Sequence, residues 1–329
     1  MSLRVGIIGA GAMGADHIRT ISTSVPSARV SAVYDFNLDT ARAAASPVGA
    51  EVVASAEALI DSSSVDAVII ASPDRTHAEL VRACLAAGKQ VLCEKPLAVT
   101  ADEAYGVVEA EVAAGRRLLQ VGFMRRFDPG FVALKRTITD GTVGEVKLVH
   151  AIHRNASSST STDDAGLITG SMIHELDTIP WLLDDEISGI RVESPIVDGF
   201  RDPQLATIWT SGGVMVTAEV FVNAGYGYDV RCEIVGSKGT ASLVPSESVS
   251  TRVAGVDGVP VRDDFVAHFA DAYRIELSTW ADQALQGVTT GPSAWDGYVA
   301  NAAAEAGVAS LASGVREPVT LKNRPSLYA

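Results

Sequence analysis

The 329-residue chain has few cysteines, no long apolar run and no cluster of basic residues. The three cysteines lie far apart and have no ligand-like neighbours, so we expect buried thiols in a reducing compartment rather than disulfides or a metal site. No window of about 18 residues is continuously apolar, so no transmembrane helix is predicted. Because the N-terminus leads straight into a strand-like run without a charged or apolar leader, we expect a cytoplasmic protein.

Positive charge is also scarce. The net charge is −14, and no run of lysine or arginine is longer than a pair. This balance disfavours nucleic acid and anionic membranes as partners. It does not disfavour an anionic cofactor, because backbone N–H groups at a helix N-terminus can hold phosphate without basic side chains.

The first part of the chain alternates short, Val- and Ile-rich runs with helical patterns, which predicts a parallel, doubly wound sheet. The expected strands are 3–9, 28–35, 65–72, 89–94 and 117–123, and the expected helices are 17–24, 39–45, 54–62, 77–87 and 100–114. Thr76 to Glu79 has the pattern of a capping box at the start of a helix.

The pattern changes after about residue 124. One strand over 145–154, a polar loop and a helix over 172–183 precede strand after strand with short turns, which predicts an antiparallel sheet. These later strands are 189–199, 204–211, 214–222, 228–236 and 239–244, and two helices follow near 265–286 and 293–313. The predicted fold is therefore α/β: a Rossmann domain (1–122) followed by an α+β domain with an open, mainly antiparallel sheet (123–329). The last helices can pack back on the first domain.

The stretch GAGAMG, residues 9–14, lies between the first strand and the first helix. In this context each glycine of GxGxxG serves a distinct purpose. Gly9 makes the tight turn, Gly11 lets the backbone approach a pyrophosphate, and Gly14 lets helix and strand pack closely. The helix N-terminus, at Ala12 and Met13, supplies N–H donors and the positive end of a dipole. The stretch predicts a dinucleotide site.

Asp35 ends the second strand, where its carboxylate can accept hydrogen bonds from the adenosine ribose hydroxyls. A 2′-phosphate would meet the negative charge of Asp35, and neither Arg nor Lys follows directly in Phe36-Asn37-Leu38. NAD is therefore favoured over NADP. A strand cap is the alternative interpretation of Asp35.

Lys95 sits within Cys93-Glu94-Lys95-Pro96, at the carboxyl end of the fourth strand, the edge where doubly wound sheets bind ligands. The proline disfavours a helical conformation for Lys95. A partly desolvated lysine there can polarise a substrate oxygen. Taken alone, a lysine after a strand is more often a solvated surface residue.

Several motifs together resemble one family. GAGAMGADH, SPDRTHAEL, CEKPLA, VGFMRRFDPG and IHELD are similar to NAD(P)-dependent sugar and cyclitol dehydrogenases typified by glucose–fructose oxidoreductase and inositol dehydrogenase. HRN (153–155) and YGYDVRCEIVG (226–236) look most like inositol 2-dehydrogenases. The resemblance covers almost the whole chain, and the pair CEKP and GFMRRFD is fairly specific.

The resemblance implies NAD-dependent oxidation of a secondary hydroxyl, with Lys95 holding the reacting oxygen and His174 taking its proton. A histidine suits this role because its ordinary pKa lies near neutral pH. The resemblance also implies a homotetramer packed through the open sheet, a small polyol or sugar as substrate, and no metal. It places Ser72, His77 and Glu94 along the cofactor and Arg125, Asn155 and Tyr228 around the polyol.

One position departs from the pattern. Inositol dehydrogenases usually have an aspartate four residues before this histidine, and this chain has Gly170. Asp177, three residues after His174, can support the ring from the same helix face, or Asp163 or Asp164 can do so from the preceding loop. Alternatively the glycine enlarges the pocket for another substrate, or the site is weakened or inactive.

Two other functions stay open. The same fold serves regulators that sense nicotinamide nucleotides, although retention of Lys95 and His174 disfavours this. It also serves glycosidases in which a transient oxidation by NAD assists elimination. Without the resemblance, His174 would be interpreted as a packed core histidine.

Overall fold

The structure, a computed structural model, describes residues 2–157, 163–196, 199–244 and 249–329. Within it the chain forms two compact units. The first unit comprises Met1–Met124, Asp271–Asn301 and Leu321–Ala329, and the second comprises Arg125–Ala270 and Ala302–Thr320. The first unit therefore combines the N-terminal part of the chain with two later segments.

A six-stranded sheet forms the centre of the first unit. Its strands are all parallel and follow the order β3-β2-β1-β4-β5-β6, which is the order of a Rossmann fold. The bounds are β1 Leu3–Ile8, β2 Ala28–Tyr34, β3 Glu51–Val52, β4 Ala67–Ile70, β5 Gln90–Glu94 and β6 Leu119–Gly122. Five of these strands confirm the sequence prediction; β3, only two residues long, was missed.

The helices of the first unit are α1 Ala12–Ser24, α2 Leu38–Ala45, α3 Ala56–Asp61, α4 His77–Ala86, α5 Ala101–Ala114, α10 Ala270–Leu285 from Asp271 on, and the first part of α11 Ala294–Ser313. Helix α1 begins five residues before its predicted start. Helix α4 begins at His77 as predicted, but the capping box there was wrong, because Thr76 makes no cap hydrogen bond. The Thr76 hydroxyl instead donates to the carbonyl of Pro73, and the capping box is formed by Thr100 and Glu103.

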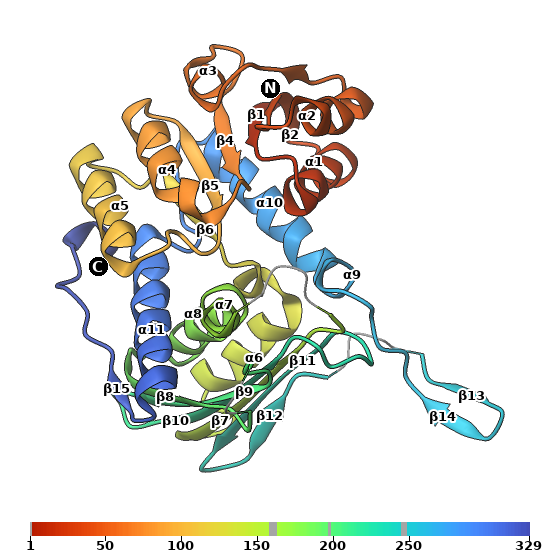
Figure 1. Ribbon diagram of the computed structural model, residues 1–329, viewed down its shortest axis with the longest axis vertical. Coiled ribbons are helices and arrows are strands. Elements are labelled where there is room, and N and C mark those ends of the chain that lie inside the picture. The colour runs from red at the N-terminus through yellow and green to blue at the C-terminus, as the bar shows by residue number, and fades with distance from the viewer. Residues whose placement is uncertain (1, 158–162, 197–198, 245–248) are drawn as a thin grey trace. The chain divides into compact units, whose positions relative to one another are not determined.

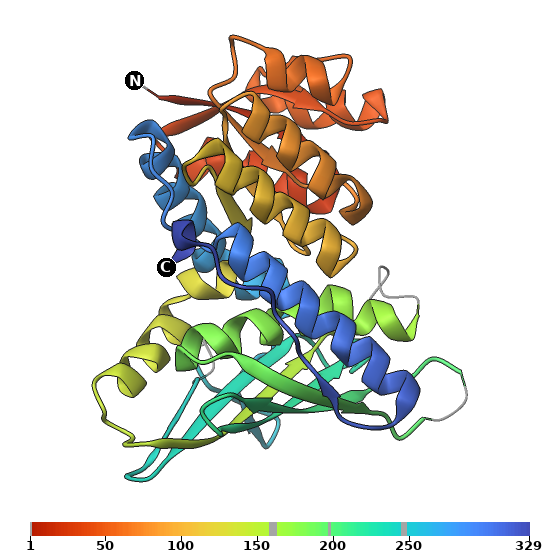
Figure 2. The same ribbon diagram turned by 90° about the vertical axis from the view of Figure 1, so that its left-hand side faces the viewer.

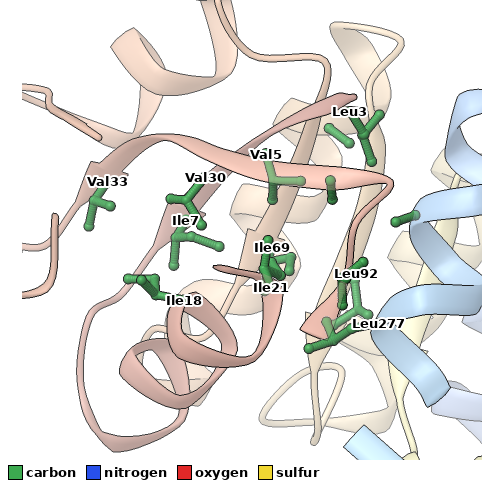
Figure 3. Close-up of a cluster of buried hydrophobic side chains, with 14 of the residues drawn as sticks. Leu3, Val5, Ile7, Ile18, Ile21, Val30, Val33, Ile69, Leu92 and Leu277 are labelled. Atoms are coloured by element: carbon green, nitrogen blue, oxygen red, sulfur yellow. The ribbon is translucent and has the colours of Figure 1, made fainter. Parts of the chain in front are cut away.

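One part of the core of the first unit lies between the sheet and helices α1 and α10. Figure 3 shows side chains of β1, β2, β4 and β5 meeting Ile18 and Ile21 of α1 and Leu277 of α10. Ile7 and Ile69 are fully buried. Burial of this apolar surface stabilises the sheet. The strand order then brings the loops at the carboxyl ends of β1, β4 and β5 to one edge of it.

A seven-stranded sheet forms the second unit, in the order β12-β11-β7-β10-β9-β8-β15. Its strands are β7 Val146–Arg154, β8 Ile187–Glu193, β9 Gln204–Thr210, β10 Met215–Phe221, β11 Asp229–Gly236, β12 Thr240–Ser242 and β15 Glu317–Pro318. The β7–β10 pair is parallel and the other pairs are antiparallel. The sheet is thus mainly antiparallel, as predicted.

Helices cover one face of this sheet. They are α6 Pro129–Thr139, α7 Asp164–Gly166, the π-helical turn η4 Leu167–Met172, α8 Ile173–Leu183, α9 Phe265–His268 and the last part of α11. Figure 2 shows α8 and α11 over the sheet, and no helix in the described part of the chain covers the opposite face. Side chains alternate accordingly: Val149, Ala151 and His153 of β7 are buried, and the residues between them are more exposed.

Three features of the second unit were missed or misplaced. Helix α6 was not predicted, although Asp128 caps it and Pro129 occupies its first turn. The hairpin β13 Thr251–Val253 and β14 Val256–Gly258 was also missed; Figure 1 shows it projecting. The helix expected over 265–286 is two helices, α9 and α10, separated at Phe269. Part of the strand expected over 189–199 lies outside the described residues.

None of the described helices is long and apolar enough to cross a lipid bilayer.

Candidate active site

The loop after β1 has the geometry that its glycines predict. Gly9 has a φ of +91°, in the left-handed region, and a Cβ there would collide with the backbone of Ala71 and Ser72. A Cβ on Gly14 would overlap the carbonyl oxygen of Gly9. Both positions therefore need glycine for close packing, in agreement with the sequence argument.

Gly11 differs from the other two glycines. A Cβ built on it would meet nothing within 4 Å, so the space above it is open. Gly11 is also the N-cap of α1, where no side chain caps the helix. The first N–H groups of the helix, at Ala12 and Met13, are thus left for an anion, and the loop fits a pyrophosphate.

Asp35 lies immediately after β2 and is 8% exposed. One carboxylate oxygen accepts a hydrogen bond from the N–H of Ala10 at 2.8 Å, and the other accepts from the N–H of Asn37 at 2.8 Å. These bonds aim the carboxylate at the glycine loop. Each oxygen retains a lone pair for a ribose hydroxyl.

Glu94 and Lys95 follow one another at the end of β5. The Glu94 side chain is buried, its Oε1 lies 2.8 Å from Nε2 of the buried His17, and its Oε2 accepts from the N–H of Lys95 at 3.3 Å. Burial raises the pKa of Glu94. The hydrogen bond to His17 and the charges of Lys95 and His77 lower this pKa by more than burial raises it, so the net shift is downward. The carboxylate therefore stays ionised beside Lys95.

Ser72 and His77 lie at the end of β4. The Ser72 hydroxyl is 2.7 Å from that of Thr76, and His77 is 1% exposed. The two ring nitrogens of His77 lie 2.7 Å from the carbonyl oxygen of Pro96 and 2.8 Å from that of Ser72. His77 thus ties two loops of the first unit together.

His174 belongs to the second unit and lies in the first turn of α8, directly after the π-helical turn η4 that contains Gly170. It is 7% exposed, and its ring packs edge-to-face on that of His153, with centroids 5.9 Å apart. Isolated π-helical turns inside α-helices are frequently found at functional sites. The distortion at this position is consistent with such a role.

His153 is the centre of a buried polar cluster, which we call the His153 cluster: Arg125, His153, Glu175 and Tyr228. Nδ1 of His153 lies 3.2 Å from Nη2 of Arg125 and 3.3 Å from Oε2 of Glu175, while Nε2 lies 3.3 Å from the Tyr228 hydroxyl. A ring protonated on Nε2 accepts from Arg125, and a ring protonated on Nδ1 donates to Glu175. The cluster therefore links the ring beside His174 to an ion pair.

Arg125 and Glu175 form that ion pair, and each side chain is 2% exposed. Burial raises the pKa of Glu175, but the charges of Arg125 and His153 outweigh this and lower it to about 2. The Arg125 guanidinium also lies over the rings of Phe131 and Phe269. The sequence placed Arg125 around the polyol; the structure shows its guanidinium bound to Glu175.

Tyr228 and Asn155 are the other two residues expected around a polyol. Tyr228 is 4% exposed, and burial raises the pKa of its hydroxyl. Asn155 follows β7, and its backbone is fixed by hydrogen bonds to Phe221 and Ala224. The Asn155 side-chain oxygen is buried and has no hydrogen-bond partner within the described residues, as expected of a group that serves a ligand.

The carboxylates proposed to support His174 all have other partners. Asp177 accepts from both Nε and Nη2 of Arg126. Asp163 caps α7, and Asp164 accepts from the backbone N–H of Arg201 at 2.7 Å. Each of these acidic side chains is thus engaged in local structure of the second unit.

Two residues of these clusters were missed by the sequence argument. Glu175 adjoins His174 in IHELD, and a carboxylate inside an otherwise apolar helix was a usable signal. His17 was not among the predicted site residues, yet its side chain is fully buried against Glu94. Nothing local to the sequence indicates that pairing, because 77 residues separate the two. No cluster suited to a metal is present among the described residues.

The glycine loop, Asp35 and the strand order define an oxidoreductase-type dinucleotide-binding unit. Residues 3–123 match the model of an oxidoreductase family with an NAD-binding Rossmann fold, and residues 131–242 match the GFO/IDH/MocA C-terminal domain. The chain belongs to the GFO/IDH/MocA family of oxidoreductases.

Relatives and solved structures match over the full length. The chain is 47% identical to inositol 2-dehydrogenase 2 of Saccharopolyspora erythraea, covering 100% of this chain and 99% of the relative. It is 44% identical to the inositol 2-dehydrogenase/D-chiro-inositol 3-dehydrogenase of Shouchella clausii, over 100% and 97%. The structure of myo-inositol dehydrogenase from Lactobacillus casei, in complex with NAD(H) and myo-inositol, superposes with a TM-score of 0.96 at 33% identity, covering 100% of both chains.

Substitution of the loop glycines is expected to separate folding from cofactor binding. Gly11→Ala places a methyl group in open space, so its thermal unfolding midpoint stays within about 2 °C of the wild type while NADH affinity falls at least about tenfold. The methyl group of Gly14→Ala would overlap the carbonyl oxygen of Gly9. This variant is therefore expected to lower both the unfolding midpoint and the NADH affinity. Differential scanning fluorimetry and NADH fluorescence titration measure the two effects. Equal losses of stability in both variants would contradict the open position of Gly11.

The Glu175–Arg125 pair is expected to make stability depend on acid pH. The pKa of Glu175 falls from its ordinary 4.5 to about 2 on folding. Its contribution, roughly 3 kcal/mol, is therefore complete above about pH 4.5 and decreases as the pH falls toward 2. Glu175→Gln removes this dependence and destabilises the protein by about 3–5 kcal/mol at pH 7.

Urea denaturation of both proteins at a series of pH values measures this contribution. Asp39→Asn is the control, because Asp39 and its partner Arg42 are exposed and the pair contributes at most about 1 kcal/mol. An unchanged pH dependence in Glu175→Gln would show that other groups account for the acid sensitivity.

Proposed function

We propose that this protein oxidises a secondary hydroxyl of a cyclitol of the myo-inositol kind, or of a related sugar, to a ketone with NAD as acceptor. The full-length likeness to inositol 2-dehydrogenases supports the substrate class. The observation that carries the proposal is His174, a buried imidazole packed on His153, in a chain that also has Lys95 after a strand of an NAD-type unit.

In the proposed reaction, NAD held at the glycine loop and Asp35 would supply the hydride acceptor. Lys95 donates a hydrogen bond to the reacting oxygen and stabilises negative charge on it. His174 takes the hydroxyl proton as general base. The negative charge of Glu94, next to Lys95, favours the ammonium form that such donation requires.

Asn155 and Tyr228 are proposed to bind the hydroxyl groups of the ring. The unpartnered carbonyl oxygen of Asn155 is suited to accept from a hydroxyl. The raised pKa of Tyr228 keeps its phenol neutral and able to donate. Arg125, neutralised by Glu175, is proposed to hold the His153 cluster in place next to this site.

Asp177 is proposed to support His174 from one turn along α8. Its carboxylate shares a helix face with His174, and Arg126 fixes its orientation through two hydrogen bonds. Because Arg126 neutralises Asp177, the stabilisation it gives to a charged His174 is weaker than that of an unpaired aspartate at position 170.

A homotetramer in a reducing compartment, such as the cytoplasm, is part of the proposal. The uncovered face of the second unit's sheet carries Met215, which is 40% exposed and pairs across the sheet with Leu148 and Trp209. Leu205, 46% exposed, lies on the same face. Apolar groups gathered on one face are typical of subunit interfaces, and the three free, buried cysteines suit reducing conditions.

The proposed function is tested by NADH formation from NAD with a panel of inositols and aldoses, comparing the wild type with Gly170→Asp. We expect turnover of a cyclitol by the wild type within about tenfold of the variant, which corresponds to about 1.4 kcal/mol. Lys95→Met is expected to lower kcat by about 10²–10⁴ without changing NADH affinity.

The other outcomes separate the alternatives. A silent wild type rescued by the aspartate means that the inositol site is present but lacks support for its base. Turnover of aldoses but of no inositol would mean that the substrate is a sugar rather than a cyclitol. Silence with every substrate in both proteins, combined with normal NADH binding, contradicts the dehydrogenase and favours a nucleotide-sensing protein.

Assembly through the open sheet is expected to fail when charge is added to it. Met215→Arg places a charge among Leu148 and Trp209 and is expected to convert a tetramer into smaller species. Sedimentation velocity measures the mass, with Val112→Arg, an exposed position on α5, as the matched control. An unchanged mass in Met215→Arg would exclude this face as the interface.

A further inference from the structure

His77 has a hydrogen-bonding environment that constrains its protonation state. It is the first residue of α4, its ring is 1% exposed, and both of its nitrogens face backbone carbonyl oxygens. Nδ1 lies 2.7 Å from the oxygen of Pro96, and Nε2 lies 2.8 Å from the oxygen of Ser72. A carbonyl oxygen only accepts hydrogen bonds.

A neutral imidazole carries one N–H and one lone pair. In this position its lone pair would point at a carbonyl oxygen at hydrogen-bond distance, which is repulsive, and one contact would be lost. Only the imidazolium donates from both nitrogens. The geometry is thus complementary to the charged ring.

The surroundings supply charge for a buried imidazolium. Glu94, at the end of β5, is buried and ionised, and its pKa is lowered by His17, Lys95 and His77 after burial has raised it. Lys95 adds positive charge of the same sign as the ring. Asp74 and Arg75, in the turn before α4, are exposed and screened by water. Glu94 is the buried negative charge among these groups, and its interaction with a charged His77 ring is favourable.

The two carbonyls belong to two loops of the first unit, the one after β4 and the one after β5 that carries Lys95. Ser72 follows β4 and lies against the turn at Gly9, as the collision of a Cβ there with the Ser72 backbone shows. Pro96 follows Lys95 directly. A ring that bonds both carbonyls therefore sets the spacing between the glycine loop and the backbone that carries Lys95.

We propose that His77 is a positioning residue: a buried imidazolium that ties the Ser72 loop to the Lys95–Pro96 loop and so holds Lys95 in place. Its importance for turnover rests on the proposed function, in which Lys95 acts on the reacting oxygen. A ring with a single N–H would keep only one of the two bonds and would hold the Lys95 loop less firmly.

The protonation state is tested without turnover. Nitrogen-15 NMR of the histidine rings in the full-length protein at pH 7, without NAD, reports whether each nitrogen carries a proton. We expect two protonated nitrogens for His77, assigned by the signals that disappear in His77→Gln. If that variant does not fold, variants of the other five histidines assign the ring by elimination. One protonated and one unprotonated nitrogen would overturn the proposal, whatever the enzyme does with inositols.

The positioning role is tested by measuring kcat and NADH affinity separately in His77→Gln. The amide introduced by His77→Gln has a single nitrogen and cannot reproduce bonds from two ring positions, so kcat is expected to fall about 10–100-fold. NADH affinity, measured by fluorescence titration, is expected to stay within about threefold.

Glu79→Gln is the matched control, since Glu79 is exposed in the first turn of the same helix and touches neither loop carbonyl. It is expected to leave kcat unchanged. A His77→Gln variant that loses NADH affinity more than about tenfold while keeping kcat would overturn the positioning role and make His77 a direct cofactor contact. If no substrate is turned over at all, the proposed function fails while the NMR result still decides the charge of the ring.

Discussion

Buried charge that must be compensated is the constraint on which both units depend. In the first unit the Glu94 carboxylate is buried between His17 and the backbone of Lys95. In the second, Glu175 is buried against Arg125 and His153. A buried carboxylate without such partners would cost several kcal/mol and would become protonated instead. The lowered pKa values of Glu94 and Glu175 show that compensation exceeds desolvation at both sites.

This constraint also explains why reactive groups and structural groups are neighbours. Lys95 follows Glu94 directly, and His174 precedes Glu175 directly, so each proposed catalytic residue is attached to a side chain that is held by an ion pair or a short hydrogen bond. Fixing the neighbour fixes the backbone of the reactive residue. Rigid support of this kind is what orientation of a reacting group requires.

The sequence predicted those parts of the molecule whose signals are local. The glycine loop, Asp35 and five strands of the first sheet follow from spacing and from continuous apolar runs, because a parallel sheet is buried on both faces. The two-residue strand β3 carries no such run. The cap at Thr76 was predicted from residue types alone, and a nearby carbonyl of Pro73 competed for the hydroxyl.

The unpredicted parts depend on partners distant in the chain. His17 and Glu94 are 77 positions apart, and Arg125 and Glu175 are 50 apart. No periodicity connects such residues, so neither pairing was predicted from the sequence. The motifs of the resemblance include the catalytic candidates, but the groups that support them electrostatically come from distant parts of the chain.

The glycine at position 170 can be considered in the same terms. An aspartate there would add a negative charge without a dedicated cation, and its full effect would be available to a charged His174. The carboxylates that the second unit does provide, Glu175 and Asp177, are each paired with an arginine. Their fields are largely cancelled at a distance, so a protonated His174 gains less from them. Under the proposed function, packing on His153 would orient the His174 ring, and the arginine-paired carboxylates Glu175 and Asp177 would stabilise its charged form less than an unpaired aspartate at position 170.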